Sequence, residues 1–402
     1  MSTPDEKTIQ KPSSSRTGMY AAVAVIAIVV IVVVVGWGAG WFSPKTPANT
    51  GPTTPLACTP PTPVAINGAG STFVYPLMFT WEQRYSHSTI AYGSVGSGTG
   101  ISDLTSKTVD FGASDAPLSP AQQALLPGGV ITIPETAGAV SIIYNLPGVA
   151  AKINFTGPVL ANIYLGTITS WDDAQIQAAN PNVGLPSQPI TVVHRLDGSG
   201  TTFAFTDYLS KVSTTWRDQV GKATTVTWPV GVAQKGSGAV STYVQTNPYT
   251  VGYVDLSYAL TNGISYAAVQ NPSGANILPS INNSRSAVID AAGTLPPGNS
   301  MQDWYNVSLI NAPGAGDYPI TTFSYLLVYG SLDGVYGTGG SGYDLNKAEN
   351  LVNFLNWTLT YGQSDSGALY YVPLPANVVQ SSQASLALVT FGGAPTPICT
   401  QA

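Results

Sequence analysis

Three glycine-rich turns restrict most strongly how this chain can fold. They are 68–73 (GAGSTF), 96–100 (GSGTG) and 197–203 (DGSGTTF). Each follows a short apolar run and precedes a segment of helical periodicity, so each predicts a strand, a tight turn and a helix start. The first N–H groups of a helix lack partners within the helix, and with Ser or Thr hydroxyls they can hold an oxyanion. A single turn of this kind is more often an ordinary capped helix start, but three in one chain favour an oxyanion site.

Apolar periodicity along the rest of the chain predicts an α/β fold, because short buried runs alternate with amphipathic segments. The length of 402 residues exceeds a single compact core, so we expect two lobes. One predicted strand starts at Ile66. The others cover Ile90–Val95, Ala137–Tyr144, Ile190–Val193, Thr250–Val254 and Thr322–Val328. The predicted helices cover Tyr75–Tyr85, Val159–Leu165, Asp172–Ala179, Phe203–Val212, Ala239–Gln245 and Leu345–Leu359. In the last helix one buried face is expected to carry Leu345, Ala348, Leu351, Val352, Leu355 and Leu359.

Charged residues are scarce in this chain. They make up 8% of it, and the formal net charge is -6. A negative chain without a basic run beyond its N-terminus is a poor partner for nucleic acid. An anion site here must therefore work through local donors and not through a broad positive field.

The N-terminal segment predicts a location outside the cytoplasm. An apolar run from Met19 to Val35, extended to Phe42, is long enough to cross a bilayer. Basic residues precede it and only Lys45 closely follows, which predicts a cytoplasmic segment at 1–18 and a transmembrane anchor at 19–42. A cleaved signal segment is the alternative, and it also leaves the remainder outside. Residues 43–64 are rich in Pro and Thr and predict an extended spacer.

Two cysteines and four sequons fit an extracytoplasmic protein. Cys58 and Cys399 bracket the globular region, and we expect them to form a disulfide, with two unpaired thiols as the alternative. Two thiols alone make a poor metal site, so no metal is expected. The Asn-x-Ser/Thr sequons are compatible with glycosylation, although several can go unused; they begin at Asn154, Asn282, Asn306 and Asn356.

Two charged residues lie close to the predicted turns. Arg195 precedes the third turn by two residues, where its guanidinium could share an anion, or it could form a surface ion pair with Asp197. Asp115 lies in the segment 109–117 (VDFGASDAP), which predicts a strand that ends in an acidic residue. By itself Asp115 would more often be a loop acid or a helix cap.

Six segments of this sequence resemble the phosphate-binding receptor of the high-affinity phosphate ABC importer. They occur in the same order and at similar spacing, and the resemblance covers roughly residues 64–380. The segments are GAGSTF, SVGSGTG, VDFGASDAPLS, IYLGTITSWDD, VVHRLDGSGTTFAF and VGYVDLSYA. The anchor, the spacer and the two cysteines lie outside the resemblance and depart from the freely diffusing bacterial form.

The resemblance implies a two-lobed periplasmic-binding-protein-like fold of type II, with two mixed sheets, flanking helices and a two-crossing hinge. Lobe I would comprise residues 65–134 and 322–402, and lobe II residues 135–321. The chain would cross the hinge near 135–139 and 318–322. Phosphate would bind between the lobes, with Asp197 steadying the arginine. The implied ligand residues are Thr72, Phe73, Ser97, Asp115, Arg195, Ser199, Gly200 and Thr201.

The resemblance further implies a monomer that binds inorganic phosphate without a cofactor and delivers it to an ABC permease in the same membrane. A carboxylate such as Asp115 tolerates an anion only if the ligand brings a proton to donate. Phosphate does so and sulfate does not, while arsenate remains compatible.

Three other functions remain as alternatives. The first two keep the fold: a receptor for another protonated oxyanion, and a phosphate sensor without transport. The third is a secreted phosphatase with a serine nucleophile, which would need a base. The chain has two histidines, His87 and His194. Strand alternation should turn His194 away from Arg195, and His87 is expected to be solvent exposed, so an enzyme is disfavoured.

Overall fold

The computed structural model describes residues 61–291, 295–296, 304–338 and 343–398. The compact unit that contains these residues runs from Leu56 to Gln401 and is an α/β structure. The predicted anchor at 19–42, most of the spacer and both cysteines lie outside the described residues. Within the described part of the chain, no helix has the length and apolar character needed to cross a bilayer.

Strands of the described residues form one mixed sheet around a long central strand. In spatial order the main path is β2 (Thr89–Ser94), β1 (Ala65–Gly70), β3 (Phe111–Ser114), β12 (Thr321–Tyr329), β4 (Val130–Asn145), β8 (Thr250–Asp255), β6 (Thr191–Arg195) and β7 (Val232–Gln234). A ninth strand, β9 (Ser265–Tyr266), pairs with β4. Small separate sheets contain β5 (Asn154–Phe155), β10 (Ala268–Gln270) and β11 (Asn276–Ile277), and β13 (Thr390–Phe391) with β14 (Ala394–Pro395).

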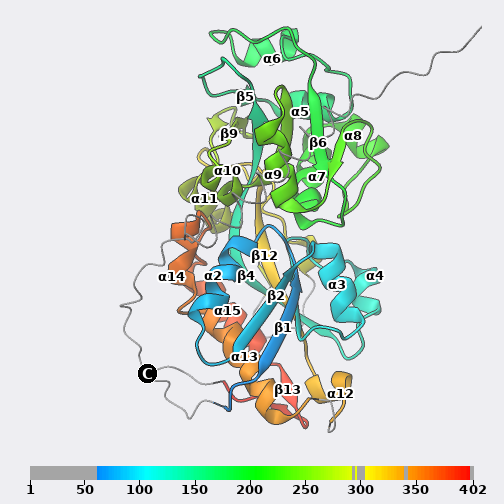
Figure 1. Ribbon diagram of the computed structural model, residues 1–402, viewed down its shortest axis with the longest axis vertical. Helices are drawn as coiled ribbons and strands as arrows, with labels where there is room; N and C mark the ends of the chain where they lie inside the picture. The colour runs from blue at the N-terminus through cyan, green and yellow to red at the C-terminus, as the bar shows by residue number, and fades with distance from the viewer. Residues whose placement is uncertain (1–60, 292–294, 297–303, 339–342, 399–402) are drawn as a thin grey trace, which may run out of the picture. The chain divides into compact units, whose positions relative to one another are not determined.

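The central strand β4 joins two sets of strands. Its residues 130–139 pair antiparallel with β12, which in turn pairs with β3. Its residues 140–145 pair antiparallel with β8, which runs parallel to β6. In Figure 1, β4 and β12 extend between the blue strands β1 and β2 and the green elements around β6. The two sets of strands therefore meet along one strand.

Helices cover both sets of strands. Those nearest in sequence to β1–β3 and β12 are α2 (Tyr75–Arg84), α3 (Ser97–Thr105), α4 (Pro120–Ala124), α12 (Leu332–Tyr336), α13 (Leu345–Leu359), α14 (Gln363–Ser366) and α15 (Ala376–Leu386). Those nearest in sequence to β5–β11 are α5 (Gly157–Tyr164), α6 (Ala174–Ala179), α7 (Gly200–Val212), α8 (Thr214–Gln219), α9 (Gly236–Thr246), α10 (Leu256–Thr261) and α11 (Ile281–Ala291). Two 3₁₀ turns are η2 (Trp304–Asn306) and η3 (Gly367–Leu369).

The structure confirms the predicted helix Leu345–Leu359 but not the whole of its predicted buried face. Ala348, Leu351 and Leu355 are fully buried, whereas Leu345 is 46% exposed. Leu345 is the first residue of α13, directly after the N-cap Asp344, so the prediction for this side chain was wrong because the first turn projects beyond the packed surface.

The predicted strand Ala137–Tyr144 is part of a longer strand, β4. The register of β4 against β12 shifts at a β-bulge, where Ser324 pairs with Thr136 and Tyr325 pairs with Pro134. Glu135 is the extra residue. Proline cannot donate a ladder hydrogen bond and is tolerated inside a sheet mainly at bulges. The bulge therefore lets the strand continue through Pro134.

Candidate functional site

The carboxyl ends of parallel strands bring the predicted site residues together. Ser71 follows β1, Ser97 begins α3 after β2, and Asp115 follows β3. In the other set of strands, Arg195 ends β6 and Ser237 lies just after β7. Ligands of open α/β sheets usually bind outside the carboxyl ends of the strands. All eight predicted ligand residues are buried in this region: Thr72, Phe73, Ser97, Asp115, Arg195, Ser199, Gly200 and Thr201.

Direct contacts join the second and third glycine turns. The N–H of Gly98 donates to the carbonyl of Gly198 at 2.9 Å, and the N–H of Gly200 donates to Ser97 Oγ at 3.1 Å. A Cβ on Gly200 would lie 2.6 Å from the Cβ of Asp115. Only glycine permits this approach, so the turn residues are selected partly by contact across the site and not only by local turn geometry.

A buried ion pair fixes the Arg195 guanidinium. Its Nε donates to Asp197 Oδ1 at 2.8 Å, and its Nη2 pairs with Asp197 Oδ2. The N–H of Gly236 also donates to Asp197 Oδ1, at 2.9 Å. Burial opposes charge on Asp197, but the hydrogen bonds and charge of Arg195, with the Gly236 amide, hold its pKa below the ordinary value. The sequence allowed an ion pair between Arg195 and Asp197 at the surface. The pair exists, but it is buried, since Arg195 is 4% exposed.

Ser237 completes this part of the site, and the sequence prediction missed it. Its Oγ lies 3.0 Å from Thr72 Oγ1, and its N–H donates to the same oxygen at 3.2 Å. Arg195 Nη1 donates to Ser237 Oγ at 3.4 Å. Ser237 is the second residue of α9, in the sequence KGSG that follows β7, a fourth strand-to-helix turn with Gly236 at φ 77°. The same glycine pattern could have identified it, but the helix was predicted to begin at Ala239.

Asp115 is a buried carboxyl with two hydroxyl donors. Its Oδ1 accepts from Ser71 Oγ at 2.5 Å and from Ser324 Oγ at 2.9 Å. Burial raises the pKa of Asp115 to about 6, against the lowering effect of these hydrogen bonds and of the Arg195 charge. The carboxyl is therefore mainly ionised at neutral pH. It does not cap a helix, because Ser119 is the N-cap of the next helix, α4.

The third glycine turn is both a helix cap and a candidate anion-binding turn, the two interpretations considered from the sequence. Ser199 caps α7, since its Oγ accepts from the N–H of Thr202 at 3.1 Å. This cap makes α7 begin at Gly200, three residues before the predicted start. The hydroxyl of Thr201, in contrast, is buried without a partner among the described residues. An unpaired buried hydroxyl costs free energy unless something binds it, so Thr201 fits a ligand position.

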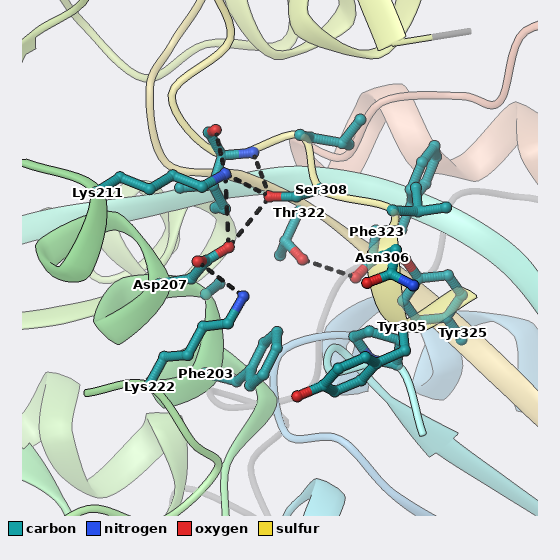
Figure 2. Close-up of a pocket in the computed structure, with 15 residues that line it drawn as sticks. Phe203, Asp207, Lys211, Lys222, Tyr305, Asn306, Ser308, Thr322, Phe323 and Tyr325 are labelled. Carbon is teal, nitrogen blue, oxygen red and sulfur yellow. Dashed lines mark hydrogen bonds and ion pairs between the residues drawn. The ribbon is translucent and has the colours of Figure 1, made fainter. Parts of the chain in front are cut away.

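A cavity of about 250 Å³ lies beside α7, and none of the predicted ligand residues lines it. Figure 2 shows Lys211, Asp207 and Ser308 pointing toward one another at this cavity. Lys211 Nζ donates to Ser308 Oγ at 2.8 Å, and Lys222 Nζ donates to Asp207 Oδ1 at 3.0 Å. Ser308 Oγ donates to Asp207 Oδ2 at 3.1 Å. These polar groups satisfy one another, and the cavity gives no support for a second anion site.

Comparisons with known proteins assign the class and then the family. Residues 57–360 match the model of the PBP superfamily domain, so the chain belongs to the PBP superfamily. The phosphate-binding protein PstS of Xylella fastidiosa is 39% identical over 341 residues, covering 83% of this chain and 87% of that protein. The phosphate-binding protein PstS of Methanocaldococcus jannaschii is 35% identical, with coverages of 80% and 85%. Within the superfamily, the chain belongs to the phosphate-binding receptors of phosphate ABC importers.

A solved structure supports the fold independently. The crystal structure of the phosphate binding protein from Stenotrophomonas maltophilia superposes with a TM-score of 0.60 at 19% identity, covering 83% of this chain and 100% of that one. The predicted α/β, periplasmic-binding-protein-like fold is therefore confirmed.

Proposed function

We propose that this chain captures inorganic phosphate outside the cytoplasm and delivers it to an ABC permease in the same membrane. Membership of the phosphate receptor family supports this function. The ligand would be held by Thr72, Phe73, Ser97, Asp115, Arg195, Ser199, Gly200 and Thr201. Ser237 would align Thr72 with Arg195, and Asp197 would keep the guanidinium in place.

The buried carboxyl of Asp115, in the field of Arg195, is the observation that carries the proposal. Both hydrogen bonds that its carboxylate accepts from described side chains end on Oδ1, which leaves Oδ2 to accept an O–H from a ligand. A fully ionised anion would place lone pairs against that oxygen in a buried site. A site built to bond an O–H can reject an analogue that lacks it by about 10⁴-fold or more. Phosphate is favoured over sulfate on this ground, and arsenate shares the required proton.

The proposal includes two lobes, residues 65–134 with 322–402 and residues 135–321, which close on the ligand. The bulge in β4 at Glu135 lies at one proposed crossing, and the start of β12 at Thr321 lies at the other. Bonds between the turns, such as Gly200 to Ser97, would form on closure. Bending at two strand positions would need little rearrangement inside either lobe.

We further propose that the N-terminal segment anchors a monomeric receptor to the membrane, with residues 43–64 as a tether and a disulfide between Cys58 and Cys399. The composition of these segments supports the proposal. Apart from residues 61–64, these segments lie outside the described residues. Mass spectrometry of the purified protein with and without reductant would test the disulfide, and membrane fractionation would test the anchor.

Glycosylation is proposed for the exposed sequon residues Asn282 and Asn306. Asn356 is a poor acceptor in the folded protein, because it is 9% exposed within α13 and its Oδ1 accepts from Gln383 Nε2 at 2.9 Å. Asn154 is half-buried.

An enzymatic function is not proposed. His194 stacks on Trp228 with ring centroids 4.9 Å apart, and its Nδ1 lies 3.1 Å from the carbonyl oxygen of Arg195. Neither contact involves a serine of the site. His87 is half-buried against Tyr85 and not solvent exposed as predicted, with ring centroids 5.4 Å apart. Neither histidine is placed to activate a serine nucleophile.

Calorimetric titration of the soluble region with phosphate, arsenate and sulfate at pH 7.5 tests the proposal. We expect tight binding of phosphate and arsenate and no measurable binding of sulfate. Asp115→Asn should weaken phosphate binding and admit sulfate, because an amide can donate to a fully ionised anion. Asp218→Asn, an exposed control, should match the wild type. Absence of phosphate binding to the wild type would refute the function.

A further inference from the structure

Glu135 is a buried acid behind the proposed phosphate site. It is the extra residue of the β-bulge in β4, and its side chain is fully buried. Its Oε1 lies 2.9 Å from Ser324 Oγ on β12. Its Oε2 is buried without a partner among the described residues. A bulge commonly redirects a side chain, and here it places an acid in the interior within the stretch of β4 that pairs with β12.

Ser324 lies between two carboxyl groups. Its Oγ is 2.9 Å from Asp115 Oδ1 and 2.9 Å from Glu135 Oε1. A serine hydroxyl carries one proton and can donate only one of these bonds. The second bond therefore requires a proton on one of the two carboxyl groups.

The surroundings decide which acid carries that proton. Asp115 accepts a further bond from Ser71, whose Oγ is itself an acceptor for the N–H of Phe73, and it lies in the field of Arg195. Within the described residues Glu135 has no cationic partner. A second negative charge beside Asp115 would be repulsive, so Glu135 is the acid that stays neutral.

The charged and titratable groups around Glu135 favour the same assignment. Burial raises the pKa of Glu135 to about 8, with the bond to Ser324 opposing and the charge of Asp115 adding to the rise. Tyr92 on β2 also interacts electrostatically with Glu135, and its own pKa lies well above the ordinary value because it is buried. Two helices pack on this stretch of β4. α15 has no charged residue. α14, whose Gln363 Nε2 donates to the carbonyl of Glu135 at 2.8 Å, carries Asp365, which pairs with Arg84.

We propose that Glu135 is a positioning residue that stays protonated and donates a hydrogen bond to Ser324. Ser324 then donates its own hydrogen bond to Asp115 Oδ1, which leaves Asp115 Oδ2 for the ligand. The proposal rests on the proposed phosphate site. When Glu135 loses its proton, Ser324 can turn its hydroxyl toward the new charge. Asp115 then loses a donor, and a second negative charge stands behind the bound anion. Phosphate affinity should fall for both reasons.

The test compares phosphate binding by the wild type and by Glu135→Gln at pH 6.5 and pH 9. Glutamine can donate to Ser324 from its amide but does not titrate. With a pKa of about 8, Glu135 is protonated in roughly one tenth of wild-type molecules at pH 9. The ratio of Kd values, wild type over variant, should rise about tenfold between the two pH values. The ratio cancels changes in the ionisation of phosphate itself.

Glu82→Gln is the matched control, since Glu82 lies on α2 and is half-buried. Its Kd ratio to the wild type should stay constant over the same range. A constant ratio for Glu135→Gln would overturn the proposal. Weak phosphate binding by the wild type at pH 6.5 would instead refute the proposed function, so the two failures are distinguishable.

Infrared spectroscopy provides a readout that does not depend on ligand binding. The difference spectrum between ligand-free wild type and Glu135→Gln at pH 6.5 should contain the C=O stretch of one protonated carboxylic acid. The band should disappear as the pH of the wild type is raised through about 8. A carboxylate band at pH 6.5 would overturn the proposal. If Glu135→Gln does not fold, the pH titration of the wild-type band, with Ser324→Ala as the comparison, answers the same question.

Discussion

Sulfate binding should become measurable when the pH falls below the pKa of Asp115. The ionised carboxylate repels a fully ionised anion, whereas the protonated form can donate its O–H to a sulfate oxygen. Burial raises the pKa of Asp115 to about 6, so the change falls within a range in which the protein can be studied. Sulfate keeps the same charge across that range, and any change in its affinity must come from the protein.

The magnitude follows from the protonated fraction of Asp115. With a pKa of about 6, roughly 1% of molecules carry the proton at pH 8 and roughly 90% carry it at pH 5. If only the protonated form binds sulfate, the apparent affinity is proportional to that fraction. Sulfate affinity should therefore rise about 90-fold from pH 8 to pH 5, which is about 2.7 kcal/mol.

The assay is competition of sulfate with phosphate, or direct calorimetric titration, at four pH values between 5 and 8. Asp115→Asn is the informative variant, because its amide donates at every pH and its sulfate affinity should be nearly constant. Asp218→Asn should reproduce the wild-type profile, since Asp218 is exposed on α8. The reasoning is refuted by a wild-type sulfate affinity that does not depend on pH, or by an Asp115→Asn profile that rises as steeply as that of the wild type.

Three further substitutions test the stability of the fold and the closure of the lobes on the ligand separately. Asp197→Ala should lower the free energy of unfolding by about 3–5 kcal/mol in urea denaturation, because it leaves the buried charge of Arg195 unpaired; an effect below about 1 kcal/mol would contradict a buried pair. Gly200→Ala should weaken phosphate binding by roughly 5- to 150-fold with little loss of stability, because its Cβ would meet Asp115 across the site. Gly184→Ala, with open space around it, is its control. The raised pKa of Glu135 means that the folded chain keeps a proton the unfolded chain releases, so stability should fall as pH rises from about 4.5 to about 8. Relative to the wild type, Glu135→Gln should gain up to about 5 kcal/mol over that window, and parallel stability curves would refute the shift.

Local sequence patterns were sufficient to locate most of the predicted elements. The boundaries of α13 were predicted correctly because an amphipathic period and a capping aspartate are both local signals. The start of α7 was predicted three residues late, since the pattern does not show which residue caps the helix. The predicted strand Ala137–Tyr144 covers only part of β4, which continues through Pro134 because pairing with β12 permits a bulge that accommodates the proline.

Local sequence specifies the glycine turns and their capacity to present amides and hydroxyls, because helix-start geometry depends on a few adjacent residues. Tertiary structure decided which of these groups meet. Arg195 and Thr72 are joined through Ser237, and the two carboxyl groups of Asp115 and Glu135 share Ser324, across long separations in sequence. It also decided their protonation, since burial is what raises the pKa of both acids, and burial exists only once the chain has packed.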